Sequence, residues 1–242
     1  MKTNRTLKIF AILVVFGLFY ATNLYAEVKI AVIDSGTTDN FYERISFSSI
    51  PANRDPTSHG TKIARIIRNS NPSAKIYMLQ VCEKSNLGYK PSARSVLKAI
   101  KWCEENDIDI VNLSLVLNYN KEIEAAIKQA YYNKGIIFIA AAGNNSLLSR
   151  FAANQDGYMC LSKTEKGSLF PASFDYVISV GAKASNGKTA DYSPSEVDVS
   201  SEGDYGKEHG TSFACARVTG EASKILTLNS NISLEELKLS LK

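Results

Sequence analysis

The chain lacks the glycine-rich phosphate-binding motifs G-x-G-x-x-G and G-x-x-x-x-G-K-[ST], so a nucleotide-binding α/β domain has no support. It also lacks internal repeats and low-complexity tracts, which excludes solenoid and disordered classes. Histidine is scarce, with two in 242 residues. What remains is a chain that is 45% hydrophobic, enough for one domain of ordinary size with its own core.

Outside the N-terminal segment, the sequence has no large excess of basic over acidic residues. The chain has 28 Lys and Arg against 24 Asp and Glu, but three of the basic residues and none of the acidic ones lie in residues 1–26. The remainder therefore has 25 basic (28 − 3) and 24 acidic residues, a net charge of +1. Such a balance gives no reason to expect nucleic acid or an anionic membrane as a partner.

Residues 1–26 have the features of a signal peptide. Three basic residues are followed by an apolar run over 9–21, which suits the core of a signal peptide and is too short to span a bilayer comfortably. We expect cleavage after Ala26 and hence a secreted or periplasmic protein with no stable membrane anchor. A buried helix or a retained anchor is the alternative. No cysteine follows the run, which disfavours a lipoprotein.

Four cysteines permit disulfides in an exported protein without showing any. Cys82 ends an apolar run and Cys103 lies on the apolar face of a predicted helix, so both are expected to be core thiols. Roughly 16 Å of helix separates them, whereas bridged Cα atoms lie within ~7 Å. Cys160 falls in a polar loop and Cys215 follows Ser212 by three residues; four unpaired thiols remain the alternative to disulfides.

Short apolar runs rich in β-branched residues are typical of parallel strands buried on two faces. They occupy 28–34, 76–82, 108–115, 135–142 and 176–182. Helical periodicity is found over 60–69, 92–106, 121–134, 211–226 and 233–241. Gly135 is expected to cap the third helix, and Ser233 with Glu236 forms a capping box. This alternation predicts an α/β fold with a doubly wound, mostly parallel sheet and helices on both faces.

Polar residues stand where the predicted strands end, which is where doubly wound sheets bind ligands. Asp34 ends the first run, and Asn144 lies on a glycine turn after the fourth, with an amide able to donate a hydrogen bond. His59 precedes a helix, and Ser212 opens another, where a serine is commonly an N-cap. A serine hydrolase needs a nucleophile, a base, a carboxylate holding the base and a donor for the oxyanion.

Six segments, in this order, resemble the subtilisin-like serine peptidases: VKIAVIDSG, HGTKIA, IVNLSL, AAAGN, FPASFDYVISVGA and HGTSFACARVTG. The resemblance covers residues 27–242 and implies a peptidase domain over that range. It implies Ser212 as nucleophile, His59 as base and Asp34 as the carboxylate, with Asn144 and the Ser212 N–H binding the oxyanion. Because the base needs a carboxylate to hold it, we favour His59 over His209, which lies three residues before Ser212.

The resemblance also implies how a protein or peptide substrate binds. The substrate would pair as an added strand with Ser114, Leu115 and Val116. Another wall of the pocket for P1, the residue before the scissile bond, would come from Ala141, Ala142 and Gly143. The connection 145–170 should rim this cleft, with a plain surface insertion as the alternative. We expect the protein to act as a monomer.

The chain departs from the family's pattern in several places. Asp34 follows the expected cleavage site by eight residues, which leaves no room for the usual propeptide. The link 70–75 is too short for the calcium loop common in relatives, so we expect no cofactor and no metal, calcium being the one candidate. Val116 and Ala216 replace the usual glycine and proline, and the chain ends early. No catalytic group is missing, which favours an endopeptidase over an inactive or weakly active peptide-binding module.

Overall fold

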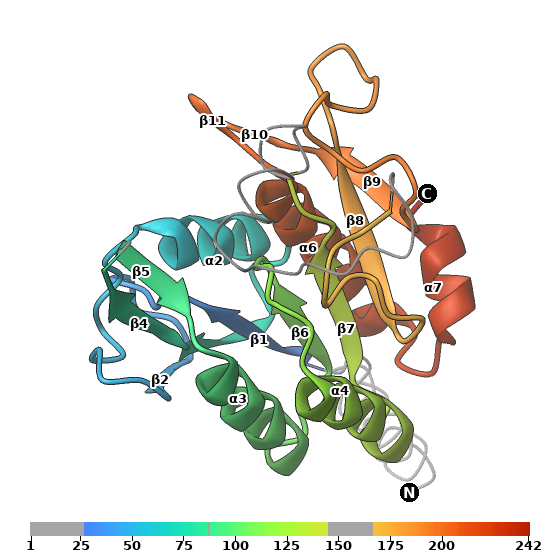
Figure 1. The fold of residues 1–242 in the computed structure, drawn as a ribbon. Helices are drawn as coiled ribbons and strands as arrows, with labels where there is room; N and C mark the ends of the chain where they lie inside the picture. Colours follow the sequence, from blue (N-terminus) through green and yellow to red (C-terminus); the bar gives the residue numbers. More distant parts are fainter. Residues whose placement is uncertain (1–26, 87, 145–166) are drawn as a thin grey trace, which may run out of the picture.

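The computed structural model describes residues 27–86, 88–144 and 167–242 (Figure 1). The predicted signal peptide, Cys160 and most of the predicted connection 145–170 lie outside the described residues.

Seven strands form one sheet in which every neighbouring pair is parallel, in the order β2-β3-β1-β6-β7-β8-β9. Its strands are β1 (Lys29–Asp34), β2 (Glu43–Ser46), β3 (Lys75–Gln80), β6 (Ile110–Leu113), β7 (Ile137–Ala141), β8 (Val177–Lys183) and β9 (Val199–Glu202). Two antiparallel pairs stand apart from it: β4 (Cys82–Ser85) with β5 (Gly88–Pro91), and β10 (Asp204–Tyr205) with β11 (Glu208–His209).

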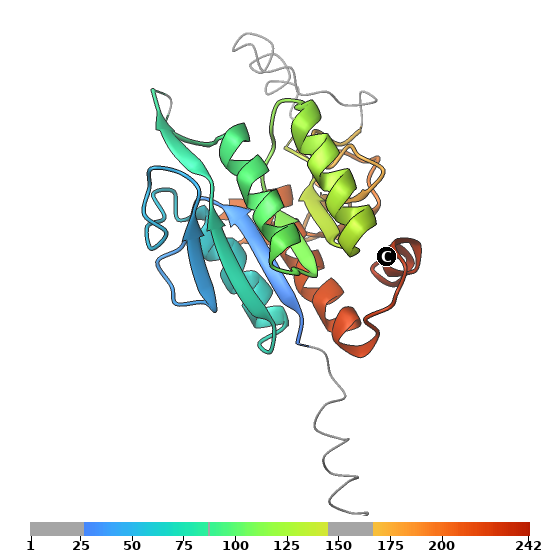
Figure 2. The same ribbon diagram turned by 90° about the horizontal axis from the view of Figure 1, so that it is seen from below.

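Helices cover both faces of the sheet, as Figures 1 and 2 show from two sides. One face is covered by α2 (His59–Ser70) and α6 (Thr211–Leu228), and the other by α3 (Ala93–Glu105) and α4 (Lys121–Lys134). The short α7 (Leu234–Ser240) packs on the α6 side through the fully buried Leu237. The predicted doubly wound α/β fold is therefore confirmed.

The predicted helices begin and end within two residues of the observed ones, and 121–134 coincides with α4. Gly135 has the left-handed backbone of a C-cap, with φ 69°, and the Ser233–Glu236 capping box is present. Five core strands were found from their apolar runs, although each is one to four residues shorter than its run or shifted at its ends. The strands missed are β2, β9 and the two small pairs, which are short and mostly polar.

The direction of winding reverses between β1 and β6. The chain passes from β1 to β3 through α2 on one face, and then returns through α3 on the other face to place β6 on the far side of β1. At such a switch point the connections leave in opposite directions and open a crevice beyond the carboxyl ends of the strands. Asp34 ends β1 and Ser114 follows β6, so both lie at this crevice.

The two helices on the first face run in parallel and touch closely where the middle of α6 meets the end of α2. A Cβ atom at Gly220 of α6 would collide with the side chain of Ser70, the last residue of α2. Beside this contact, the buried Asn71 amide donates to Ser223 Oγ at 3.0 Å. Both helices start at the carboxyl edge of the sheet.

Cys82, Cys103 and Cys215 are buried and unpaired. Cys82 and Cys103 are thus core thiols with no bridge between them, as predicted. Burial raises the pKa of the Cys82 and Cys215 thiols to about 12, so both stay protonated at neutral pH.

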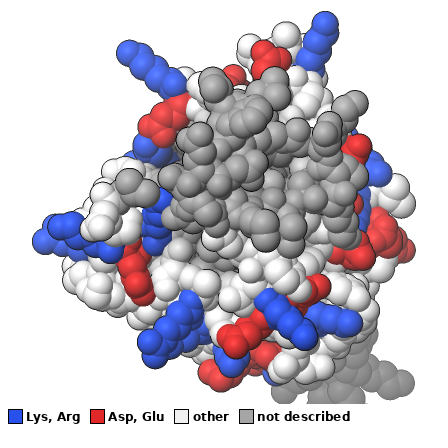
Figure 3. Space-filling view, in the orientation of Figure 1, with Lys and Arg blue, Asp and Glu red and all other residues white. Residues whose placement is uncertain are grey.

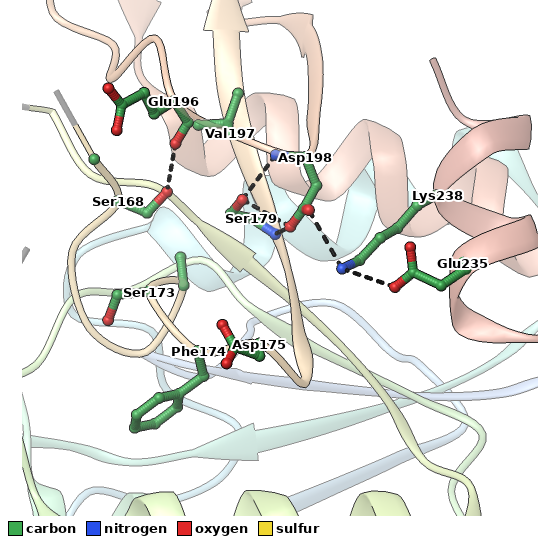
Figure 4. Close-up of a pocket in the computed structure, with 12 residues that line it drawn as sticks. Ser168, Ser173, Phe174, Asp175, Ser179, Glu196, Val197, Asp198, Glu235 and Lys238 are labelled. Carbon is green, nitrogen blue, oxygen red and sulfur yellow. Dashed lines mark hydrogen bonds and ion pairs between the residues drawn. The ribbon is translucent and has the colours of Figure 1, made fainter. Parts of the chain in front are cut away.

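The last helix is held to the sheet by a half-buried ion pair (Figure 4). The Lys238 ammonium lies 3.3 Å from Asp198 Oδ1 and 3.5 Å from Glu235. The other oxygen of Asp198 accepts hydrogen bonds from the backbone N–H and hydroxyl of Ser179. These groups line a cavity of about 610 Å³ between α7, the β8–β9 connection and the residues after Gly167. Its lining includes none of the residues predicted to act on a substrate.

Among the described residues on the face seen in Figure 3, basic and acidic side chains lie interspersed around the rim. Among the helices of the described residues, none is long and apolar enough to cross a membrane.

Candidate active site

Asp34 is the last residue of β1 and is buried, with 4% of its surface exposed. Its Oδ1 accepts a hydrogen bond from the Ser35 backbone N–H at 2.7 Å. The Nδ1 atom of His59 lies 2.9 Å from Oδ1 and 3.0 Å from Oδ2. Since a carboxylate can only accept, Nδ1 carries the proton and the opposite nitrogen, Nε2, is left as the basic atom of the neutral ring.

Glycine is required where α2 approaches β1. A Cβ atom at Gly60 would collide with the carbonyl oxygen of Gly36 and lie 3.2 Å from the Asp34 side chain. Gly36 itself has φ +101°, in the left-handed region that favours glycine. The two glycines that follow Asp34 and His59 therefore let the turn and the helix come close enough for the carboxylate and imidazole to bond.

A second carboxylate, which sequence reasoning missed, holds the beginning of α2. The N-cap residue Ser58 has a left-handed backbone and makes no side-chain capping bond. Asp55 replaces that cap, because its Oδ2 accepts from the Thr61 backbone N–H at 2.8 Å and from the Thr61 hydroxyl at 2.6 Å. An acidic residue just before a predicted helix was the available signal, since carboxylates favour helix N-termini.

Ser35 joins the two carboxylates. Its hydroxyl lies 3.1 Å from Asp34 Oδ1 and 2.8 Å from Asp55 Oδ1, and it accepts from the Gly60 backbone N–H at 3.0 Å. The site therefore holds its histidine through a small polar network rather than through a single bond.

The surroundings raise the pKa of His59 above its ordinary value of 6.5. The negative charge of Asp34 is the largest cause, and the hydrogen bond to Asp34 and the charge of Asp55 act in the same direction. Burial of the ring and the nearby Lys62 ammonium oppose the rise. The imidazolium that forms when His59 accepts a proton is thus stabilised in place.

Ser212 is the second residue of α6. The N-cap position belongs to Gly210, so the capping interpretation of this serine is wrong. Its hydroxyl donates to the Ser114 carbonyl at 3.2 Å, and the described residues show no hydrogen bond between Ser212 and His59. The His59 ring lies 6.1 Å from the ring of Phe213, the next residue of α6. The serine and the histidine thus lie on facing helix N-termini, and a turn of the serine side chain would be needed to bring them together.

The backbone N–H of Ser212 is placed to bind an anion. Thr211 donates its N–H to Asn144 Oδ1 at 3.0 Å, and Phe213 donates its N–H to the Gly210 carbonyl at 3.2 Å. Between them, the Ser212 N–H has no acceptor within the described part of the chain. A first-turn N–H at the positive end of a helix is a favourable place for negative charge.

Asn144 follows the turn after β7 and lies beside this N-terminus. Its Oδ1 accepts from both the backbone N–H and the hydroxyl of Thr211, at 3.0 and 3.1 Å. The same hydroxyl accepts from the Gly143 N–H at 3.2 Å. These bonds fix which end of the amide is oxygen, and its nitrogen lies 3.3 Å from the position of a Cβ atom on Gly210.

The predicted substrate-binding residues fall into two groups. Ser114 is buried against α6, while Leu115 and Val116 are half-buried in a segment that belongs to no strand. The second group, which consists of Ala141, Ala142 and Gly143, is buried. Leu169 covers it, because its N–H donates to the Ala142 carbonyl and its side chain lies against Gly143.

The remaining candidates are the second histidine and the link between α2 and β3. His209 is in β11, with its ring 5.1 Å from that of Tyr192, whereas His59 is the histidine bonded to Asp34. The link between α2 and β3 is four residues long, in agreement with the short connection predicted. Within the described ranges, no three His, Cys, Asp or Glu side chains are arranged to hold a metal ion.

Comparison with known proteins identifies a family. Residues 26–242 match the model of the Subtilase family. Subtilisin DY of Bacillus licheniformis is 28% identical over 243 residues, covering 88% of this chain and 81% of that protein. Subtilisin amylosacchariticus of Bacillus subtilis subsp. amylosacchariticus is 29% identical over 230 residues, covering 84% of this chain. The match spans 56% of the length of that relative.

Solved structures share the fold. A cold adapted subtilisin-like serine proteinase superposes with a TM-score of 0.68 at 23% identity, covering 87% of this chain and 79% of that one. A lanthipeptide protease superposes with a TM-score of 0.65 at 20% identity, covering 91% and 80%.

We predict that the pKa of His59, measured by NMR titration of its ring, lies above 6.5 and falls when the nearby carboxylates are neutralised. Asp34→Asn removes the largest cause and should lower the pKa most, because burial then dominates. Asp55→Asn should lower it less. A pKa that does not change in Asp34→Asn would contradict this electrostatic account.

Proposed function

Because the chain belongs to the subtilase family of serine peptidases, we propose that it is a serine endopeptidase with Asp34, His59 and Ser212 as its catalytic triad. The observation that carries this proposal is the part-buried Asp34–His59 hydrogen bond, which lies near a helix N-terminus where the Ser212 N–H has no acceptor among the described residues. Such a constellation is recognised by the geometry and roles of its members.

Acylation begins when Nε2 of His59 takes the proton of the Ser212 hydroxyl as its oxygen attacks the scissile carbonyl carbon. Before this, the hydroxyl must leave the Ser114 carbonyl, a small rotation of the kind that substrate-free sites commonly need. Asp34 keeps Nδ1 protonated and stabilises the imidazolium. His59 then gives the proton to the leaving amine, and water releases the acyl group by the same route.

The tetrahedral intermediate places a negative charge on the former carbonyl oxygen. The Ser212 N–H and the Asn144 amide are the two donors proposed to bind it. The orientation of Asn144 by Thr211 supports this role, because both bonds engage the oxygen of the amide, which identifies the nitrogen as its donating end. Donors fixed before the reaction are worth more than donors that must reorganise.

The substrate is proposed to bind as an extended strand along Ser114, Leu115 and Val116, in the crevice between β1 and β6. The backbone of this segment supports the proposal, since it follows a buried strand and is paired with no strand among the described residues. Ala141, Ala142 and Gly143 would form a second wall through their backbone.

A peptide-binding module without activity is the second candidate. The observation in its favour is that the Ser212 hydroxyl donates to Ser114 rather than to His59. Activity measurements separate the two, because a binding module has no turnover to lose.

Ser212→Ala is expected to lower the turnover of casein or a peptide substrate by about 10⁴–10⁶-fold while leaving the melting temperature almost unchanged. His59→Ala should cause a loss of similar size. His209→Ala is the matched control and should retain activity, because the His209 ring packs on Tyr192 and makes no hydrogen bond or ion pair with a carboxylate in the described part of the chain. Cleavage by Ser212→Ala at the wild-type rate would show that the nucleophile is another residue.

Val116 is expected to narrow the P1 pocket. A β-branched side chain has few rotamers, and overpacking costs ~1–3 kcal/mol, with each 1.4 kcal/mol tenfold in rate. We therefore expect a peptide library to show preference for small or slender P1 residues, and Val116→Gly to raise kcat/KM for P1 Phe and Tyr about tenfold or more. Val116→Ala should give a smaller gain. A wild-type profile dominated by aromatic P1 residues would mean that Val116 faces away from the pocket.

Residues 1–26 are proposed to be a signal peptide. Residues 27–242 are then the peptidase domain, which is secreted or exported to the periplasm. The start of the family match at residue 26 and of β1 at Lys29 supports this boundary. Mass spectrometry of the protein recovered outside the cytoplasm should find Glu27 as its first residue. Recovery of the chain in the cytoplasm with its first 26 residues intact would overturn the proposal.

A further inference from the structure

A chain of buried polar groups leads from the middle of α6, through β6, to the peptide of Ser212. Asn112 lies in β6 with none of its surface exposed. Its Oδ1 accepts from the Thr219 hydroxyl at 2.9 Å and from the Cys215 thiol at 3.3 Å. Its amide nitrogen donates to Ser114 Oγ at 3.0 Å.

These hydrogen bonds run in one direction, and the last of them is made to Ser212. The Ser114 hydroxyl accepts from Asn112, so its own proton is directed to the Ser212 carbonyl at 2.9 Å. The Thr219 hydroxyl donates to Asn112, and the Cys215 thiol lies within reach of both Asn112 Oδ1 and the Ile139 carbonyl, at 3.3 and 3.5 Å. The raised pKa of the buried Cys215 keeps its thiol protonated. Each polar group in the chain has a partner, which removes the penalty for burying it.

Hydrogen bonds add direction to the apolar packing of α6. The helix buries Phe213, Val218 and Leu226 in the core, while Ala214, Cys215 and Ala216 beside Ser212 are small and fully buried. Hydrogen bonds are directional and tolerate little displacement. The bonds of Asn112 to Cys215 and Thr219 therefore restrict how far this part of the helix can shift or rotate over β6.

The backbone of Ser212 is consequently clamped from two sides. Asn144 holds the preceding Thr211 through its N–H, and Ser114 holds the carbonyl of Ser212 itself. Together these bonds hold the peptide before Thr211 and the peptide after Ser212, so the peptide between them, which carries the Ser212 N–H, is held from both ends. They determine the direction of the Ser212 N–H bond and the position of the Ser212 Cβ atom.

We infer that Asn112 is a positioning residue for catalysis: through Ser114 it aims the N–H and hydroxyl of Ser212 at the substrate carbonyl in the transition state. Asn112 touches neither substrate nor reacting atoms in this scheme and acts only through its neighbours. The inference rests on the proposed function, in which Ser212 is the nucleophile.

The test compares two buried asparagines that each bond to α6. Asn112→Ala removes the chain that ends at Ser212, and Asn71→Ala removes the bond to Ser223, eleven residues further along the helix and roughly 16 Å away. Each variant is assayed on a peptide substrate for kcat and KM, and its melting temperature is measured by calorimetry. All assays are run at a temperature at which every variant is folded.

Asn112→Ala should lower kcat about 10- to 100-fold and leave KM within about twofold, since a small misplacement of an oxyanion donor or nucleophile has effects of this size. Asn71→Ala should lose a comparable melting temperature and keep kcat within about twofold. Wild-type kcat in folded Asn112→Ala, or an equal loss of kcat in Asn71→Ala, would overturn the inference.

Two further variants keep the test decisive if Asn112→Ala does not fold. Thr219→Val keeps the shape of the side chain and removes one donor to Asn112, and Ser114→Ala removes the last link. Both should lower kcat with KM retained, and combining them should cost less than the product of the single effects, because they interrupt one chain. Multiplicative effects, or no effect on kcat, would overturn the inference. An inactive wild type would instead show that the proposed function fails.

Discussion

The close parallel contact between α2 and α6 is the constraint on which the rest of the site depends. His59 and Ser212 are separated by 153 positions in the chain (212 − 59), and each stands at the start of its helix. The missing side chain at Gly220 lets the middle of α6 approach Ser70 at the end of α2. Two N-termini are thereby brought to the same edge of the sheet. The first N–H groups of α2 donate to Thr57, Ser35 and Asp55, whereas the Ser212 N–H of α6 has no acceptor among the described residues.

The sheet supplies the other half of the arrangement. Asp34 ends β1 at the switch point, and the glycines at 36 and 60 allow its carboxylate to reach the imidazole. The Asp34 and Asp55 charges raise the pKa of His59 while burial lowers it. The ring can therefore act as a base and stays bonded to Asp34 once it is protonated. The approach of α2 to the end of β1 thus sets both the position of His59 and its pKa.

Sequence patterns predicted the parts of the fold that have a strong period or a strong local signal. The apolar runs gave the buried strands, and the Gly135 cap and the Ser233 capping box gave two helix ends. The edge strands β2 and β9 have polar, half-exposed residues and are strands because of their neighbours. The motif residues at strand and helix ends could be named in advance. For Ser212 the sequence also suggested an N-cap, but that position belongs to Gly210.

The supporting residues of the site could not be named from the sequence, because their partners are distant. Asp55 bonds across a loop to Ser35 and Thr61, and Asn112 bonds to residues more than 100 positions away on α6. A buried asparagine in an apolar run has no periodic signal of its own. Its role is visible only once α6 is seen to lie across β6.

Labelling with a fluorophosphonate probe tests the central claim most directly, because the probe reacts with a serine only when its hydroxyl is activated by a neighbouring base. The labelled protein would be digested and the adduct located by mass spectrometry. The account predicts a single adduct on Ser212, formed in the wild type and absent from His59→Ala. An adduct on another serine, or no adduct on the folded wild-type protein, would contradict it.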